Sequence, residues 1–249
     1  MFRLSHFILL FSLFSSSVFA HFSIDKTRLY FDRNIRFQTL TLRNTSSAPV
    51  AYTIKVNHVY MTEEGKVLPV KDESTVKQSA KKLLRYSPRS GTILPGGSQI
   101  VRFTVRKPAG LESGEYRSQL RMEGGLLGDE NTLAARIAYN MPVIIRHGQT
   151  EATADIAFLG IKEGANSKPA MSILVKREGN RSLFGSFTIT NDRGEKIGLT
   201  KGISVYEPLT QRSVDIELTG PVTRQVTVKY EELKEFGGTE TVIKTFDIQ

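Results

Sequence analysis

Apolar and polar residues alternate along much of this chain of 249 residues. The pattern is clearest at positions 39–43, 50–57 and 101–106, where every second residue is apolar. Successive side chains of a β-strand point to opposite faces, so this period of two is typical of strands with one buried and one solvated face. The same period returns in the second half, as at Val214, Ile216 and Leu218. The sequence therefore predicts an all-β fold with antiparallel sheets.

Turn-forming residues separate these stretches at short intervals, for example at 44–47, 95–97 and 192–194. Many short strands with such punctuation are typical of a β-sandwich, which needs about 100 residues. The clearest boundary between two such units is His147-Gly148-Gln149-Thr150. We therefore expect an N-terminal domain over residues 21–147 and a C-terminal domain over residues 148–249.

Residues 1–20 have the features of a secretory signal peptide. Arg3 supplies the positive charge, residues 7–14 an apolar stretch, and residues 18–20 a cleavage pattern that ends at Ala20. A membrane anchor is the alternative, but the apolar run is short and broken by serines. We expect cleavage after Ala20 and export of the remaining chain.

The residues that catalysis or metal binding would require are sparse. The chain has no cysteine, which excludes disulfides, a thiol nucleophile and cysteine-ligated metals. His21, His58 and His147 are far apart and have no metal-ligand spacing. There is no Gly-x-Ser-x-Gly motif, and the acidic residues that stand together are adjacent pairs, whose side chains point to opposite faces of a strand or lie in turns. We expect no enzyme activity, no cofactor, no metal and no small-molecule substrate.

The formal net charge is +9 for the whole chain and +8 once the leader with Arg3 is removed. Such an excess is compatible with binding to nucleic acid, an anionic membrane surface or an acidic protein. The lysines and arginines are scattered, however, and no run of them interleaves with aromatic residues. We therefore expect no nucleic-acid partner.

The segment 133–146 does not behave like an ordinary core strand. One face carries Leu133, Ala135, Ile137, Tyr139 and Met141, and Pro142 follows directly. Because proline cannot donate to a sheet ladder, this segment is expected to be an edge strand or to contain a local break. A long apolar edge in an exported protein invites pairing, so one interpretation is that another polypeptide shares it. The alternative is a core strand with Pro142 at its rim.

Several short stretches follow one another in an order and spacing typical of a known family: 24–32, Pro88, 94–96, 101–102, 114–117 and 144–146. In these stretches the chain resembles the periplasmic chaperones of chaperone–usher pilus assembly. Segments 85–89 and 142–148 resemble the divergent, archaic branch of that family. The lack of cysteine and the short connection at 124–132 argue against the branch with a long loop there. The second domain matches only in size and β character.

This resemblance implies two immunoglobulin-like domains in an L-shaped arrangement and a location in the periplasm. It implies that the clients are pilus subunits, or pilins, whose own sandwich lacks a final strand. The chaperone lends its seventh strand to the subunit until an outer-membrane usher exchanges it for the next subunit. On this reading Leu133, Ala135, Ile137 and Tyr139 are the donor residues. Self-association of the free protein through the same edge is a further expectation.

The resemblance also implies two polar sites. Arg28, in an Asp-x-x-Arg context, matches the first of two basic residues that hold the C-terminal carboxylate of the subunit. The second family position is a lysine, and Pro142 stands there in this sequence, so Arg89 or else Arg85 is the expected substitute. Glu115 and Arg146 match an interdomain ion pair, expected to fix the angle between the domains more than to add stability.

Two other functions remain open at this point. The chain could be a pilus structural subunit or adhesin, but such a protein would carry an N-terminal donor extension and lack its last strand. It could be a secreted carbohydrate-binding β-sandwich protein, but tryptophan is absent and no facing pair of acids stands out.

Overall fold

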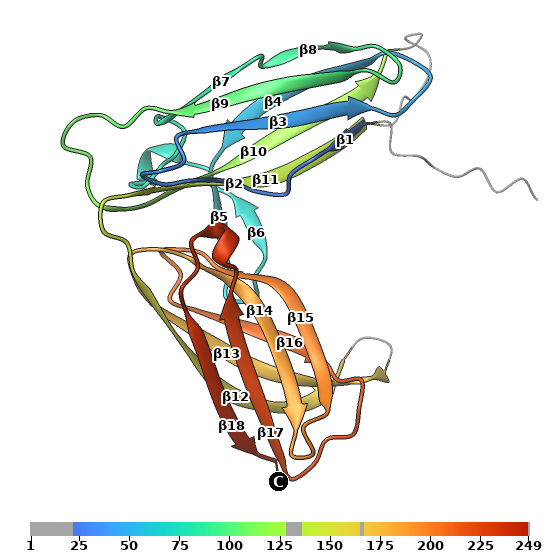
Figure 1. Ribbon diagram of the computed structural model, residues 1–249, viewed down its shortest axis with the longest axis vertical. Helices are drawn as coiled ribbons and strands as arrows, with labels where there is room; N and C mark the ends of the chain where they lie inside the picture. Colours follow the sequence, from blue (N-terminus) through green and yellow to red (C-terminus); the bar gives the residue numbers. More distant parts are fainter. Residues whose placement is uncertain (1–21, 128–135, 165–166, 249) are drawn as a thin grey trace, which may run out of the picture.

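The computed structural model describes residues 22–127, 136–164 and 167–248. These residues form two β-sandwich domains that lie as the arms of an L (Figure 1). The helical elements that are described in full are two short 3-10 turns, η1 (Glu73–Thr75) and η3 (Lys234–Phe236). The prediction of an all-β chain with two sandwiches is confirmed.

The N-terminal domain packs two sheets against each other. The first sheet has the order β1-β3-β9-β7, with β1 at Phe22–Ile24, β3 at Phe37–Asn44, β9 at Ser98–Val105 and β7 at Leu84–Ser87. The second has the order β2-β11-β10-β4-β8, with β2 at Leu29–Phe31, β11 at Arg136–His147, β10 at Gly114–Leu126, β4 at Val50–Asn57 and β8 at Ser90–Ile93. The three alternating stretches of the sequence correspond to β3, β4 and β9, and their apolar residues form part of the core between the sheets.

The beginning of the chain passes from one sheet to the other. β1 pairs with β3 in the first sheet, whereas β2 pairs in parallel with β11 in the second. The crossing between them contains Arg28, directly before β2. This change of sheet leaves β2 beside only the C-terminal part of β11, where Leu29, Tyr30 and Phe31 face Val143, Ile144 and Ile145.

The C-terminal domain is a second sandwich with its own core. One sheet has the order β12-β13-β16, with β12 at Ala152–Glu163, β13 at Pro169–Gly179 and β16 at Gln211–Glu217. The other has the order β15-β14-β17-β18, with β15 at Lys196–Val205, β14 at Leu183–Asn191, β17 at Gln225–Glu232 and β18 at Thr241–Asp247. Phe187 and Tyr230 are fully buried between these sheets, with ring centres 4.8 Å apart.

A small hairpin of the N-terminal domain reaches the C-terminal domain. It consists of β5 (Val59–Met61) and β6 (Val67–Pro69), which lie between the two arms in Figure 1. At its tip the carbonyl of Glu63 accepts a hydrogen bond of 2.8 Å from the backbone N–H of Ser213 on β16. Directly before the turn, Met61 at the end of β5 joins a buried interdomain cluster with Tyr30, Ile144 and Tyr206. The hairpin therefore ties the two domains together at a second point besides the chain connection.

Candidate functional site

The first half of β11 is paired on one side only. β10 pairs with β11 from Gly114↔His147 to Gly125↔Arg136, whereas β2 covers only Val143 to Ile145 on the opposite side. Among the described residues, no strand pairs with positions 136–142 on that opposite side, and we call this stretch the open edge. Such an edge presents free backbone N–H and C=O groups to any strand that approaches it.

Pro142 lies where the open edge meets the paired part of β11. It stands opposite Gln119 of β10, one residue before the pairing with β2 begins. Proline has no N–H to donate, so it is tolerated at an edge or where pairing changes. The strand thus has both properties that the sequence suggested: an edge in its first half and a buried core segment in its second.

Of the four residues predicted to form the donor strand, the structure describes Ile137 and Tyr139, and both side chains face the inner side of the sheet. Tyr139 packs against Phe22 of β1 at 5.9 Å between ring centres, and its hydroxyl donates a 2.6 Å hydrogen bond to the carbonyl of Phe22. Ile137 is half-buried opposite Gly124. A Cβ atom on Gly124 would approach the Phe22 ring to 2.7 Å, so this glycine lets the aromatic ring lie directly on the strand. Leu133 and Ala135 lie outside the described residues.

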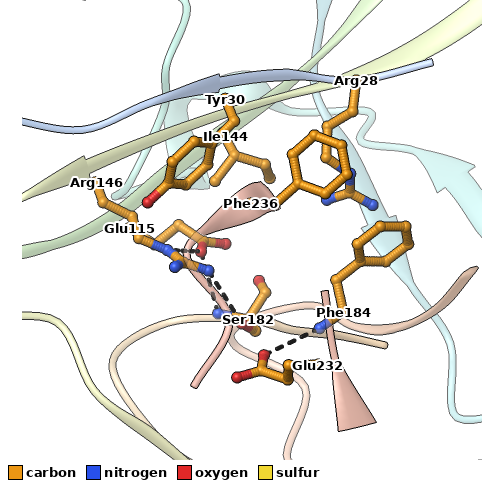
Figure 2. A pocket seen from close by; sticks show the side chains of 10 residues that line it. Arg28, Tyr30, Glu115, Ile144, Arg146, Ser182, Phe184, Glu232 and Phe236 are labelled. Atoms are coloured by element: carbon orange, nitrogen blue, oxygen red, sulfur yellow. Dashed lines mark hydrogen bonds and ion pairs between the residues drawn. The ribbon is translucent and has the colours of Figure 1, made fainter. Parts of the chain in front are cut away.

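Arg28 lies at the junction of the domains under an aromatic cover from the C-terminal domain (Figure 2). Its guanidinium carbon is 3.6 Å from the ring centre of Phe184, 5.4 Å from that of Phe236 and 5.9 Å from that of Tyr206. Cation–π attraction of this kind stabilises a buried arginine by about 0.5–2 kcal/mol. The contacts explain how Arg28 is only 8% exposed although it carries a charge.

Arg28 differs from the other buried arginines in its hydrogen-bond partners. The buried arginines and acidic residues of the described chain are four arginines and two glutamates: Arg28, Arg146, Arg177, Arg181, Glu115 and Glu232. Arg146 and Arg181 each pair with one glutamate, and Arg177 donates to three backbone carbonyls. The hydrogen bonds of Arg28 are two contacts of 3.4 Å to the hydroxyls of Ser204 and Tyr206. Among the described residues Arg28 has no carboxylate partner. It is therefore the buried cation best placed to bind a carboxylate from another molecule.

The structure brings Glu115 and Arg146 together, as the resemblance implied. The Arg146 Nε donates to Glu115 Oε2 at 3.1 Å, and both side chains are buried. Both partners also reach the C-terminal domain: Arg146 donates to the carbonyl of Gly237 at 2.8 Å, and Glu115 accepts from the N–H of Ser182 at 3.2 Å. The expectation of a small stability effect needs correction, because removing one partner of a buried pair leaves an uncompensated charge.

A second buried pair, absent from the sequence-based expectations, lies beside the first. Arg181 binds Glu232 through two parallel hydrogen bonds of 2.8 and 2.9 Å. Burial alone would raise the pKa of the Glu232 carboxyl, but the hydrogen bonds from Arg181 and from the backbone of Glu240 and Thr239 outweigh burial and lower it. Arg181 lies in the turn between β13 and β14, where nothing in the local sequence pattern signals a buried charge.

Arg85 and Arg89 are not brought to Arg28. Arg85 is on β7 of the other sheet and donates to the carbonyls of Lys82 and Leu84, while Arg89 lies 5.1 Å from the ring centre of Tyr86. Figure 1 shows β7 and β8 on the side of the N-terminal domain away from the C-terminal domain. Arg117 of β10 does share a neighbour with Arg28, because its guanidinium carbon is 4.3 Å from the ring centre of Tyr206.

No group of three or more metal-binding side chains occurs within the described parts of the chain. The same parts contain no helix that is long and apolar enough to cross a membrane.

No protein-family model matches the sequence, and a search of curated proteins finds no match. Solved structures do resemble the fold. The YadV chaperone superimposes with a TM-score of 0.55 at 11% identity, over 92% of this chain and 100% of that one. A chain in the complex of Salmonella enterica SafA pilin with the SafB chaperone gives 0.51 at 13% identity, over 90% and 96%. The fold is thus similar to that of chaperone structures, one of them solved in complex with a pilin.

Proposed function

We propose that this protein is a periplasmic chaperone that binds pilus or fimbrial subunits by donor-strand complementation and delivers them to an outer-membrane usher. The observation that carries the proposal is the open edge of β11, which is amphipathic and paired on one side only. The likeness to chaperone structures supports it, since one of them was solved together with a pilin. Export through the leader at residues 1–20 and cleavage after Ala20 belong to the same proposal.

The open edge gives a physical mechanism for binding. A subunit that lacks a strand has unpaired backbone groups and an exposed apolar groove, and an added strand supplies both kinds of contact. Each net backbone hydrogen bond contributes about 0.5–1.5 kcal/mol, and each apolar side chain that becomes buried about 1.5–3 kcal/mol. Leu133, Ala135 and Ile137 are proposed to enter the groove, and Tyr139, already packed on Phe22, to lie at its margin.

Arg28 is proposed to hold the C-terminal carboxylate of the subunit. A guanidinium donates two parallel hydrogen bonds to a carboxylate, a stronger arrangement than its two 3.4 Å contacts to hydroxyls in the free chain. Because Arg28 is only 8% exposed, the aromatic cover of Phe184, Tyr206 and Phe236 has to shift for the carboxylate to enter. We propose that the charge of Arg117, rather than Arg89 or Arg85, compensates for the lysine that Pro142 replaces.

Hydrogen exchange on a complex tests the proposal directly. The protein is co-expressed with a pilus subunit, the complex is purified, and amide exchange is compared with that of the free chain. We expect slower exchange on complex formation at the alternate positions of the open edge whose N–H groups point away from β10, while β12 and β13 serve as an internal control and keep their rates. A stable complex without protection in β11 would show that another surface binds the subunit. Absence of any complex would refute the chaperone role.

A further inference from the structure

The net positive charge of the chain that follows the leader lies in one of its two domains. Residues 21–147 contain 20 Lys and Arg residues against 11 Asp and Glu residues, a net charge of +9. Residues 148–249 contain 13 against 14, a net charge of −1. A surplus of one sign attracts a partner of the opposite sign, so the surface of the N-terminal domain favours an anionic partner.

The first sheet of that domain carries arginine but no acidic residue. Its strands β1, β3, β9 and β7 contain Arg43, Arg102 and Arg85 and no Asp or Glu. The residues on either side of each arginine are buried or packed on the core, so the three arginines point to the outer side of the sheet. Arg106 follows directly after β9 and continues this alternation. All four side chains are exposed.

These four arginines form no ion pair among the described residues. Asp25 lies beside β3 at the margin of the sheet, but its carboxylate accepts a hydrogen bond from the backbone N–H of Thr41. In the C-terminal domain, by contrast, an exposed cation such as Lys229 binds a carboxylate, that of Glu231, at 2.8 Å. The positive charges on the outer side of the first sheet therefore attract anions from outside the protein.

Two apolar side chains lie between these arginines on the same outer side. Phe37 of β3 is 54% exposed, and Ile100 of β9 is 46% exposed. The register places Arg102 in the row between them, because Phe37 stands opposite Thr104 and Ile100 opposite Thr41. We call this surface the basic face, and it consists of Phe37, Arg43, Arg85, Ile100, Arg102 and Arg106. It combines cations with isolated apolar side chains on an open sheet surface.

We propose that the basic face docks the protein on the surface of a bilayer that contains anionic phospholipids. The head groups supply the negative charge that the arginines attract, and the boundary with the acyl chains takes up Phe37 and Ile100. An acidic polypeptide would pair with the arginines but leave these two apolar side chains without an apolar environment.

Docking by this face leaves the other surfaces of the protein uncovered. The open edge belongs to the second sheet of the N-terminal domain. Figure 1 shows β9 and β7 on the side of this domain away from the C-terminal domain. A chain that lies on a bilayer by the basic face therefore keeps its open edge and its interdomain junction accessible.

Flotation with lipid vesicles tests the proposal on the purified protein without the leader. One set of vesicles contains phosphatidylglycerol and phosphatidylethanolamine in equal parts, and the other contains phosphatidylcholine alone. We expect binding to the anionic vesicles at low ionic strength, a decrease of this binding as the salt concentration rises, and no binding to the neutral vesicles. Absence of binding to the anionic vesicles, or equal binding to both sets, would overturn the proposal.

A pair of double variants locates the contact with the vesicles. Arg102→Gln with Arg106→Gln removes two charges from the basic face. Each arginine near an anionic membrane contributes about fivefold to binding, so we expect a loss of about 25-fold. Arg193→Gln with Arg224→Gln removes the same charge from exposed positions of the C-terminal domain and should leave binding unchanged. Equal losses in the two proteins would mean that net charge, and not the basic face, attracts the vesicles.

Phe37→Ser distinguishes a bilayer from an acidic polypeptide, for which poly-L-glutamate is the probe. The side chain is more than half exposed, so the variant is expected to fold and to bind anionic vesicles about fivefold more weakly. Unchanged vesicle binding by this variant would refute insertion of Phe37. If the Arg102→Gln, Arg106→Gln protein loses binding to poly-L-glutamate but not to vesicles, the face serves an acidic chain and the lipid assignment is wrong. No pilus subunit takes part, so failure here leaves the chaperone proposal untouched.

Discussion

The substitution Ile137→Arg tests whether a subunit is bound by strand donation from β11 or by another surface. In the free chain Ile137 is half-buried, opposite a glycine that offers it no side chain. Full burial of an isoleucine is worth about 1.5–3 kcal/mol, so roughly half of that, about 1–1.5 kcal/mol, remains to be gained in a complex. An arginine forfeits this gain and also places an unpaired charge in an apolar groove, which costs several kcal/mol more. The sum of about 4 kcal/mol or more corresponds to a loss of about a thousandfold in affinity.

The assay is co-purification of the variant with a co-expressed subunit, followed by titration where a complex is recovered. Ala138→Arg is the matched control, because the same charge is introduced one residue further on, at an exposed position on the opposite face of the strand. We expect Ile137→Arg to remain folded by circular dichroism and to recover no subunit, while Ala138→Arg recovers a normal amount. Equal losses in the two variants would mean that β11 does not insert as a strand with a period of two. Normal recovery with Ile137→Arg would refute the assignment of the donor face.

Three further outcomes are expected. Arg28→Lys keeps the charge but loses the planar fork, so affinity for a subunit should fall about tenfold by titration, and an unchanged affinity would move the carboxylate site elsewhere. Glu115→Gln should lower the free energy of unfolding by about 3–5 kcal/mol in a denaturant titration, because it leaves the buried Arg146 unpaired. Glu123→Gln, in a partly exposed pair, should lower it by at most about 1 kcal/mol. Equal losses in the two variants would contradict the burial argument. The lowered pKa of Glu232 means that its ionised form stabilises the fold above the unfolded pKa near 4.3, a contribution that disappears as the pH falls through the lower folded value. The thermal midpoint should therefore drop on acidification below about pH 4, and less steeply in Glu232→Gln; parallel curves would remove Glu232 from this role.

The strands and their core faces were accessible from the sequence because each depends on a local pattern. The alternation at 50–57 predicts β4, and its apolar positions are the ones buried between the sheets. The proline at 142 indicates a change of pairing within β11, and the structure has that change at the next residue. A period of two and a missing N–H act within a few residues, so no knowledge of distant contacts was needed.

The contacts between the domains could not be predicted from local sequence patterns. Nothing around Phe184 or Phe236 indicates that these rings cover Arg28, since the three positions are brought together only by the packing of two sandwiches. Arg181 and Glu232 are likewise 51 positions apart, and each looks like a solvated charge in its own segment. Arg89 was favoured for its sequence context, but it lies between β7 and β8, on the side of the N-terminal domain away from the C-terminal domain (Figure 1). Long-range electrostatics depends on sheet membership, which the alternation alone does not assign.

The β10–β11 pair connects the two regions that the proposed function requires. At one end Glu115 stands opposite Arg146 and binds the C-terminal domain, and at the other Gly124 stands opposite Ile137 beside the open edge. The register runs without a shift from Gly114↔His147 to Gly125↔Arg136, so the pair is one continuous ladder. A strand added at the open edge would therefore join the same sheet that carries the contacts of Glu115 and Arg146 with the C-terminal domain, about 30 Å along the ladder at roughly 3.4 Å per residue. A subunit that binds the edge and places its carboxylate near Arg28 would contact both ends of this ladder, which makes the buried pair Glu115–Arg146 a determinant of how the two contacts are spaced.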